Sequence, residues 1–145
     1  MILQFIMAMS ATFAFSVLYN APKKRYFLCS LGGAFAWISY LCCVNFGGDV
    51  VLSSLFATFL LTVYCRIVSV LTRTPVTVYL LSGIFTLVPG AGIYYTAYYL
   101  IMSDVANFQS KGLETFKVSG AMVIGIVFGF AIPQALFTLF TRKES

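Results

Sequence analysis

The segment from Thr74 to Ser103 carries no charged residue and is interrupted near its middle by Pro89 and Gly90. About 20 helical residues cross the hydrocarbon core of a bilayer, so this segment is long enough to span it. Proline removes a backbone donor and glycine has a low helix propensity, so the sequence predicts that this helix is broken. Because freed backbone groups need partners in lipid, such a break is tolerated only where it is buried in protein or lines a wet cavity.

The composition indicates an all-α, polytopic membrane protein. Of the 145 residues, 61% are hydrophobic and 9% are charged, whereas a soluble domain carries about 25% charged residues. We expect a single membrane domain over residues 1–145 with five transmembrane helices, at approximately 1–20, 26–44, 50–71, 76–102 and 118–140. The fourth helix is predicted to be broken at Pro89-Gly90, and the polar stretch from Ser103 to Lys117 is predicted to be a loop.

The basic residues predict how these helices are oriented. Lys23, Lys24 and Arg25 follow the first apolar segment instead of preceding it, which favours a retained helix over a cleaved signal peptide. With five spans, this cluster falls on the same side of the membrane as Arg66, Arg73 and the basic tail. Because basic loops stay in the cytoplasm, the amino terminus is predicted outside and the carboxyl terminus in the cytoplasm.

The residue types that support catalysis and metal binding are scarce. The chain has no histidine, which is the commonest general base and metal ligand. Its four cysteines lack Cys-x-x-Cys spacing and are interpreted as small apolar residues of helices. We therefore expect no catalysis by this chain alone, no metal and no cofactor. The net charge of +5 lies at the ends of apolar runs and does not indicate a nucleic-acid partner.

The acidic residues all fall at predicted helix ends or in predicted loops. These residues are Asp49, Asp104, Glu114 and Glu144. No carboxylate is therefore expected at the middle of the membrane to carry a proton.

Two half-helices, Val76–Val88 and Gly92–Met102, are expected on either side of the break. The second would place free backbone N–H groups and the positive end of its dipole at mid-membrane, which suits a carboxylate. In this interpretation Pro89 and Gly90 set the break, and Gly92 allows close approach. The candidate substrate-binding residues are Thr86, Pro89, Gly90, Gly92, Tyr94 and Thr96. A proline-kinked helix that only packs against a neighbour is the alternative, and spacing alone does not decide between them.

Small residues spaced four apart predict faces where helices approach closely. Gly125 and Gly129 form one such face, and Gly32 and Gly33 lie in another apolar segment. Helix-packing roles are therefore expected for these four glycines. Pro133 is expected to kink the fifth helix near its inner end.

Thr58, Thr62 and Arg66 recur every four residues and form one polar stripe along the third helix. This stripe is expected to face protein or water and not lipid. An arginine at the bilayer centre costs about 3 kcal/mol, so Arg66 is expected to extend its guanidinium to the membrane surface from its place near the helix end. A role in lining a pore is the alternative.

Several short motifs, spread over nearly the whole chain, resemble those of a known family. They are Asn20-Ala21-Pro22-Lys23-Lys24, Gly32-Gly33, the segment from Trp37 to Tyr40, Arg73-Thr74-Pro75, and Leu87-Val88-Pro89-Gly90 followed by Tyr94. In these motifs the chain resembles the small, second subunit of two-component transporters of the threonine/serine exporter superfamily. That subunit is similar to the carboxy-terminal half of single-chain exporters. Thr86 departs from the pattern, because the family often has another proline at this place.

The resemblance implies a subunit of an exporter in the bacterial cytoplasmic membrane, which acts in the bilayer together with a larger membrane subunit. It implies export of a small carboxylate-bearing solute, either a small amino acid such as threonine or serine or a dicarboxylate such as succinate. Two other interpretations remain open. One is a non-transporting scaffold or regulatory subunit. The other, disfavoured by the missing histidines and mid-membrane carboxylates, is a membrane-embedded enzyme.

Overall fold

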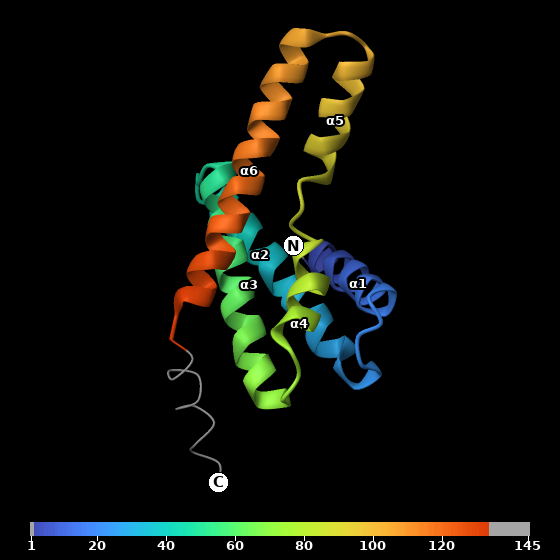
Figure 1. Ribbon diagram of the computed structural model, residues 1–145, viewed down its shortest axis with the longest axis vertical. Helices are drawn as coiled ribbons and strands as arrows, with labels where there is room; N and C mark the ends of the chain where they lie inside the picture. Colours follow the sequence, from blue (N-terminus) through green and yellow to red (C-terminus); the bar gives the residue numbers. More distant parts are fainter. Residues whose placement is uncertain (1, 134–145) are drawn as a thin grey trace.

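The computed structural model describes residues 2–133, and within this range all regular secondary structure is helical. The helices are α1 (Ile2–Leu18), the short 3₁₀-helix η1 (Lys23–Arg25), α2 (Tyr26–Asn45), α3 (Val50–Thr72), α4 (Val76–Ile84), α5 (Gly90–Ile101) and α6 (Val105–Ala131), as Figure 1 shows. The all-α class predicted from the sequence is confirmed. The predicted helix from 134 to 140 and the basic tail lie outside the described residues.

Three of these helices are long and apolar enough to cross a membrane, namely Lys23–Asn45, Val50–Thr72 and Val105–Ala131. The first helix, Ile2–Leu18, is apolar but shorter. With 9 and 12 residues, α4 and α5 each extend no more than about 18 Å, short of the hydrocarbon core of about 30 Å. The predicted fourth span is therefore present as two short helices in series.

The break between α4 and α5 begins earlier than the sequence predicts. The first half-helix ends at Ile84 and not at Val88, and the chain turns through hydrogen bonds from Thr86 to the Gly83 carbonyl (3.3 Å) and from Leu87 to the Ile84 carbonyl (2.9 Å). These i to i−3 bonds tighten the last turn of a helix. A residue before proline is disfavoured in the α conformation, so Val88 cannot continue the helix into Pro89.

The predicted loop from Ser103 to Lys117 is wrong, because this stretch is helical from Val105 onward. Only a tight turn separates α5 from α6, with Ser103 in the left-handed region (φ 58°). Asp104 then caps α6 by accepting a hydrogen bond from the backbone N–H of Asn107 at 3.2 Å, which satisfies one of the free donors of the first turn. The polar residues that follow include good helix formers, namely Gln109, Lys111, Glu114 and Lys117.

The sequence predicts that Pro133 kinks the last helix. In the structure α6 instead ends at Ala131, before Pro133. Ile132 is extended (φ −62°, ψ 127°), as expected for the residue before a proline.

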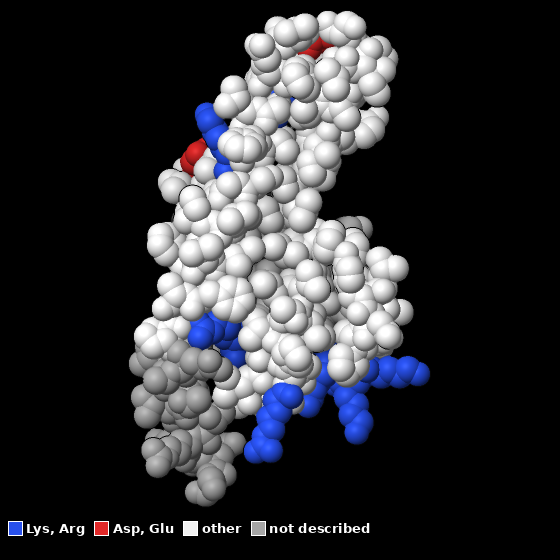
Figure 2. Space-filling model, viewed as in Figure 1, with Lys and Arg blue, Asp and Glu red and all other residues white. Residues whose placement is uncertain are grey.

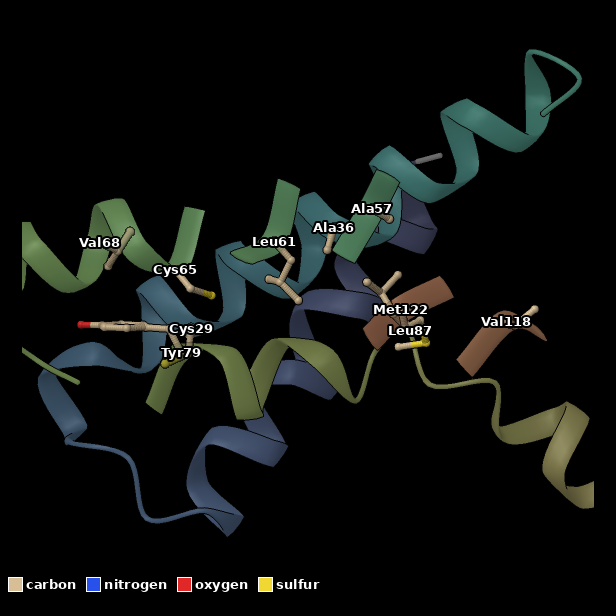
Figure 3. Close-up of a cluster of buried hydrophobic side chains, with 10 residues drawn as sticks. All are labelled: Cys29, Ala36, Ala57, Leu61, Cys65, Val68, Tyr79, Leu87, Val118 and Met122. Atoms are coloured by element: carbon tan, nitrogen blue, oxygen red, sulfur yellow. The ribbon is translucent and has the colours of Figure 1, made fainter. Parts of the chain in front are cut away.

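The core lies where α3 packs against α2, α4 and α6. Figure 3 shows its buried side chains, which come from all of these elements and from the α4–α5 connection. They are Cys29, Ala36, Ala57, Leu61, Cys65, Val68, Tyr79, Leu87, Val118 and Met122. Most are small or medium-sized, whereas many large apolar side chains point outward. This distribution is typical of membrane helices, which associate through small residues.

Glycines lie at the closest helix contacts. An added Cβ at Gly32 would meet the Tyr64 ring at 2.7 Å, and one at Gly33 would meet the Thr12 side chain. Gly125 and Gly129 lie on the face of α6 that contacts α3, where an added Cβ would meet backbone or threonine atoms of that helix. These four positions therefore allow the backbones to approach.

The polar stripe of α3 faces protein, as predicted. Thr58 and Thr62 are fully buried, and their hydroxyls donate to the backbone carbonyls of Ser54 and Thr58, both at 2.8 Å. The stripe lies against Gly125 and Gly129 of α6.

The sequence analysis expects the guanidinium of Arg66 to extend to a surface. In the structure Arg66 is instead buried, with 8% of its surface exposed. Its Nη1 donates to the backbone carbonyls of Gly129 (2.9 Å), Phe130 (3.0 Å) and Ile132 (2.5 Å). The last carbonyls of a helix have no partners within it and carry partial negative charge, so a guanidinium there both satisfies and stabilises them. Arg66 thus caps α6.

The α1–α2 and α3–α4 connections meet at one end of the molecule. The Nη2 of Arg25, in η1, donates to the carbonyl of Thr72 at the end of α3 at 3.0 Å. Lys and Arg side chains gather at this end in Figure 2, and Figure 1 shows that the α2–α3 and α5–α6 turns point the other way. The two basic connections predicted to be cytoplasmic are therefore neighbours.

Candidate functional site

The helix break lines a cavity of about 600 Å³. It lies between the helices of the core and the α5–α6 hairpin, which extends beyond them in Figure 1. The wall is formed by Trp37 and Tyr40 of α2, Val50 and Ser54 of α3, the segment from Thr86 to Gly92, Tyr95 of α5, and Lys111, Glu114, Thr115 and Val118 of α6. A volume of about 300–1,000 Å³ is usual for a site that binds a small molecule.

The first turn of α5 presents backbone donors at this cavity. The first α-helical hydrogen bond is donated by the Ile93 N–H to the Pro89 carbonyl at 3.0 Å, so the N–H groups of Ala91 and Gly92 precede it. No side chain caps this end of α5, in contrast to Asp104 at the start of α6. The positive end of the α5 dipole and its free donors therefore favour an anionic group in the cavity.

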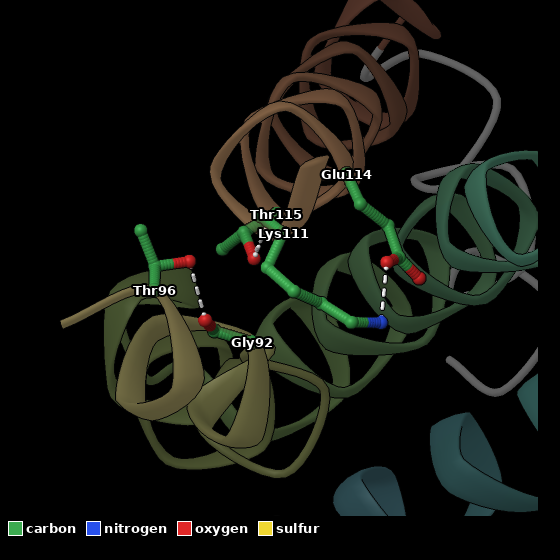
Figure 4. Close-up of polar contacts among 5 residues, drawn as sticks. All are labelled: Gly92, Thr96, Lys111, Glu114 and Thr115. Atoms are coloured by element: carbon green, nitrogen blue, oxygen red, sulfur yellow. Dashed lines mark hydrogen bonds and ion pairs between the residues drawn. The ribbon is translucent and has the colours of Figure 1, made fainter. Parts of the chain in front are cut away.

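Two glycines of the break have different surroundings. An added Cβ at Gly90 meets no atom within 4 Å, so this position borders open space. An added Cβ at Gly92 would meet the Oγ1 of Thr115, as the close approach of the two helices in Figure 4 shows. Gly92 therefore permits the contact between α5 and α6, whereas Gly90 leaves open space at the break.

One face of α6 completes the wall of the cavity. Lys111, Glu114, Thr115 and Val118 have the i, i+3, i+4, i+7 spacing of residues on one side of a helix. The Nζ of Lys111 lies 2.8 Å from the Glu114 carboxylate (Figure 4), and the side chains are 46% and 52% exposed. The sequence analysis missed Lys111, Glu114 and Thr115 because it placed them in a loop. Their helical spacing is the signal that could have identified them.

The structure brings together only some of the candidate residues named from sequence. Thr86, Pro89, Gly90 and Gly92 all line the cavity. The Thr86 hydroxyl shares a hydrogen bond of 2.8 Å with the hydroxyl of Thr12 in α1.

Tyr94 and Thr96 do not line this cavity. Tyr94 is 63% exposed, and its neighbour Tyr95 reaches the cavity instead. Thr96 uses its hydroxyl to donate to the Gly92 carbonyl at 2.7 Å (Figure 4).

A second, more open cavity of about 340 Å³ lies beside the first. Residues of α1 form most of its wall, and it shares Trp37 and Thr86 with the larger cavity. These two side chains therefore stand between the two spaces.

The turn between α5 and α6 carries a carboxylate with a shifted pKa. The Asn107 side chain donates to Asp104 at 2.7 Å, and its backbone N–H donates at 3.2 Å. These hydrogen bonds hold the pKa of Asp104 below its usual value. A lowered folded-state pKa stabilises the fold above the unfolded-state pKa, and this contribution is lost as pH falls through the folded-state pKa.

No group of three or more metal-ligating side chains occurs among residues 2–133. The groups that the cavity offers to a solute are hydroxyls, aromatic rings, backbone donors and one ion pair. Such groups bind and orient a small polar molecule.

Comparison with known protein families identifies the family of the chain. The family model described as "Threonine/Serine exporter, ThrE" matches residues 4–132. Searches of curated proteins and of solved structures found no match to the chain. The family match covers nearly all of the helical region, including the break and the face of α6 opposite it. The chain therefore belongs to the threonine/serine exporter family.

Proposed function

We propose that the cavity at the helix break binds a small carboxylate-bearing solute, and that the chain exports this solute as the smaller subunit of a two-subunit transporter in the bacterial cytoplasmic membrane. Membership of the exporter family supports transport. The observation that carries the proposal is that the uncapped amino-terminal end of α5 lines a cavity of about 600 Å³. Discontinuous helices whose amino-terminal ends point at anionic groups bind solutes in many transporters.

The mechanism is alternating access, without chemical change to the solute. Pro89 and Gly90 keep the backbone donors of α5 free, and Gly92 holds α5 against α6 at Thr115. The bound carboxylate accepts hydrogen bonds from these donors, since the dipole of α5 favours negative charge there.

A larger membrane subunit is proposed to cover the hairpin of α5 and α6. No residue of α5 is buried in the single chain, and apolar side chains such as Tyr94, Ile101 and Phe116 are 63%, 79% and 78% exposed. An apolar surface of this kind is covered by lipid or by another membrane chain.

Substitution of Gly90 by leucine tests the role of the cavity. Its Cβ would meet no atom within 4 Å, and the rest of the side chain would occupy space that a solute needs. We expect solute counterflow in vesicles to fall about tenfold or more, because overfilling a site costs about 1–3 kcal/mol. Gly120→Leu is the matched control, since Gly120 also borders open space but does not line the cavity. It should leave counterflow unchanged.

The assay compares threonine, serine and succinate in vesicles that contain the chain with and without the larger subunit. Equal activity of the two leucine variants would contradict a solute site at the break. Loss of co-purification with the larger subunit in the Pro89→Ala/Gly90→Ala variant, with no separate defect in transport, would support the scaffold interpretation instead.

The proposed orientation places the amino terminus outside and the carboxyl terminus in the cytoplasm. The clustering of η1 with the end of α3, both of which carry basic residues, supports this orientation. We expect a reporter fused after Ser145 to be active in the cytoplasm and one inserted after Gly47, in the α2–α3 connection, to be active outside. The opposite pattern would exclude this topology.

A further inference from the structure

Lys111 and Glu114 are the charged side chains among the described residues that line the cavity. They lie one turn apart on α6, on the face opposite the break, and form an ion pair at 2.8 Å. Both side chains are about half exposed (46% and 52%), so a solute in the cavity can reach each of them. The cavity thus offers one cation and one anion side by side, in the same wall as the first turn of α5 with its backbone donors.

An exposed ion pair of this type contributes little to stability, because water screens the attraction and two long side chains lose freedom. Exchanging the Lys111–Glu114 contact for contacts between each side chain and an oppositely charged group of a solute therefore costs little free energy. A solute with adjacent carboxylate and ammonium groups can pair with both side chains at once. Its carboxylate pairs with Lys111 and the α5 donors, and its ammonium pairs with Glu114.

A dicarboxylate fits the same wall less well. One of its carboxylates can pair with Lys111, but the other adds negative charge to a cavity that already holds Glu114. Once a bound solute has displaced water from the cavity, screening is weaker than in the empty site, so the two like charges repel more strongly there. Specificity of this kind comes from repulsion of the wrong solute as much as from attraction of the right one.

We propose that Glu114 is the residue that makes this site select zwitterionic amino acids over dicarboxylates, with Lys111 as the partner of the solute carboxylate. This inference rests on the proposed function, because it assumes that the cavity at the break is the solute site. Glu114 pairs with the ammonium group of the solute and repels a second carboxylate.

The test measures competition with threonine counterflow, in vesicles that hold the chain and its larger subunit. The competitors are unlabelled threonine, 3-hydroxybutyrate (which lacks the amino group), threonine methyl ester (which lacks the carboxylate) and succinate. The wild-type assembly should prefer threonine over all three other compounds.

Glu114→Gln should reduce the preference for threonine over 3-hydroxybutyrate and over succinate by about tenfold or more, because it removes one charged hydrogen bond and one repulsion. Lys111→Gln should reduce the preference for threonine over its methyl ester. Lys117→Gln removes a charge from the same helix at a position that does not line the cavity, and should change none of these ratios.

The ratios separate a role in selection from a role in folding, since a folding defect lowers the activity with every compound equally. Unchanged ratios in Glu114→Gln, or a wild-type preference for succinate, would overturn the inference while leaving the proposed transport intact. Absence of counterflow with threonine, serine and succinate in the wild-type assembly would instead overturn the proposed function.

Discussion

Replacement of Gly125 by alanine is expected to destabilise the protein, whereas the same replacement at Gly120 is expected to stabilise it. An added Cβ at Gly125 would lie 2.5 Å from the carbonyl oxygen of Leu55 and 3.2 Å from the backbone nitrogen of Phe59. Backbone atoms cannot rotate away, so α3 and α6 would have to separate. Overpacking of this type lowers the free energy of unfolding by about 1–3 kcal/mol.

The opposite sign at Gly120 follows from helix propensity. No atom lies within 4 Å of an added Cβ at this position, and alanine favours the helix over glycine by about 1 kcal/mol. The two substitutions are chemically identical and lie in the same helix, so their difference measures the α3–α6 contact alone.

Thermal unfolding of the detergent-solubilised protein measures both effects. The buried thiols of Cys29 and Cys65 become reactive toward a fluorescent maleimide when the core opens. Thr58→Ala should not rescue Gly125→Ala, because the Leu55 carbonyl remains in place. Equal melting temperatures for Gly120→Ala and Gly125→Ala would show that the two helices do not approach as closely as described.

Substitution of Arg66 by methionine is expected to have the second large effect. Methionine keeps an unbranched apolar stem, although it is shorter than arginine, and removes the donors to the carbonyls of Gly129, Phe130 and Ile132. It also removes the guanidinium from the ring of Phe130, whose centroid lies 5.8 Å away. A buried acceptor without a partner costs about 1–3 kcal/mol. Only the Gly129 bond is fully buried, and the bonds to Phe130 and Ile132 are part-buried, so we expect a total loss of about 2–4 kcal/mol, less than three full penalties.

The same maleimide assay, combined with hydrogen exchange at the last turn of α6, checks this prediction. Arg66→Lys should recover only part of the loss, because an ammonium cannot reproduce the geometry of the guanidinium. Arg73→Met removes the same charge from an exposed position at the end of α3 and should change stability by no more than about 0.5 kcal/mol. Unchanged hydrogen exchange at the last turn of α6 in Arg66→Met would mean that the arginine does not cap the helix.

Hydropathy predicted where the apolar helices run but not where α6 begins. The prediction treated Ser103 to Lys117 as a loop because it is polar, although it contains good helix formers such as Lys111 and Glu114 and Asp104 provides the cap. Hydropathy distinguishes apolar from polar segments and does not distinguish a polar helix from a loop. Helical spacing at Lys111, Glu114 and Thr115 carries the missing information.

The role of Arg66 could not be predicted from its own surroundings in the sequence. Its acceptors lie more than 60 residues away along the chain, at the end of α6. Near the end of an apolar helix, a solvent-exposed arginine and a buried cap have the same local sequence pattern. Only the packing of α3 against α6 distinguishes them.

The sequence by itself determined the helical, strongly apolar character of the chain and the break at Pro89, because hydropathy and backbone sterics act locally. It also determined the small residues that let the helices approach. The tertiary structure alone decided which groups meet at the break. Tyr94 and Thr96 lie away from the cavity, while Lys111 and Glu114 line it. The physical reason is that the close contact between Gly92 and Thr115 sets which faces of α5 and α6 point into the cavity, and such a contact between distant residues is not encoded in any local pattern.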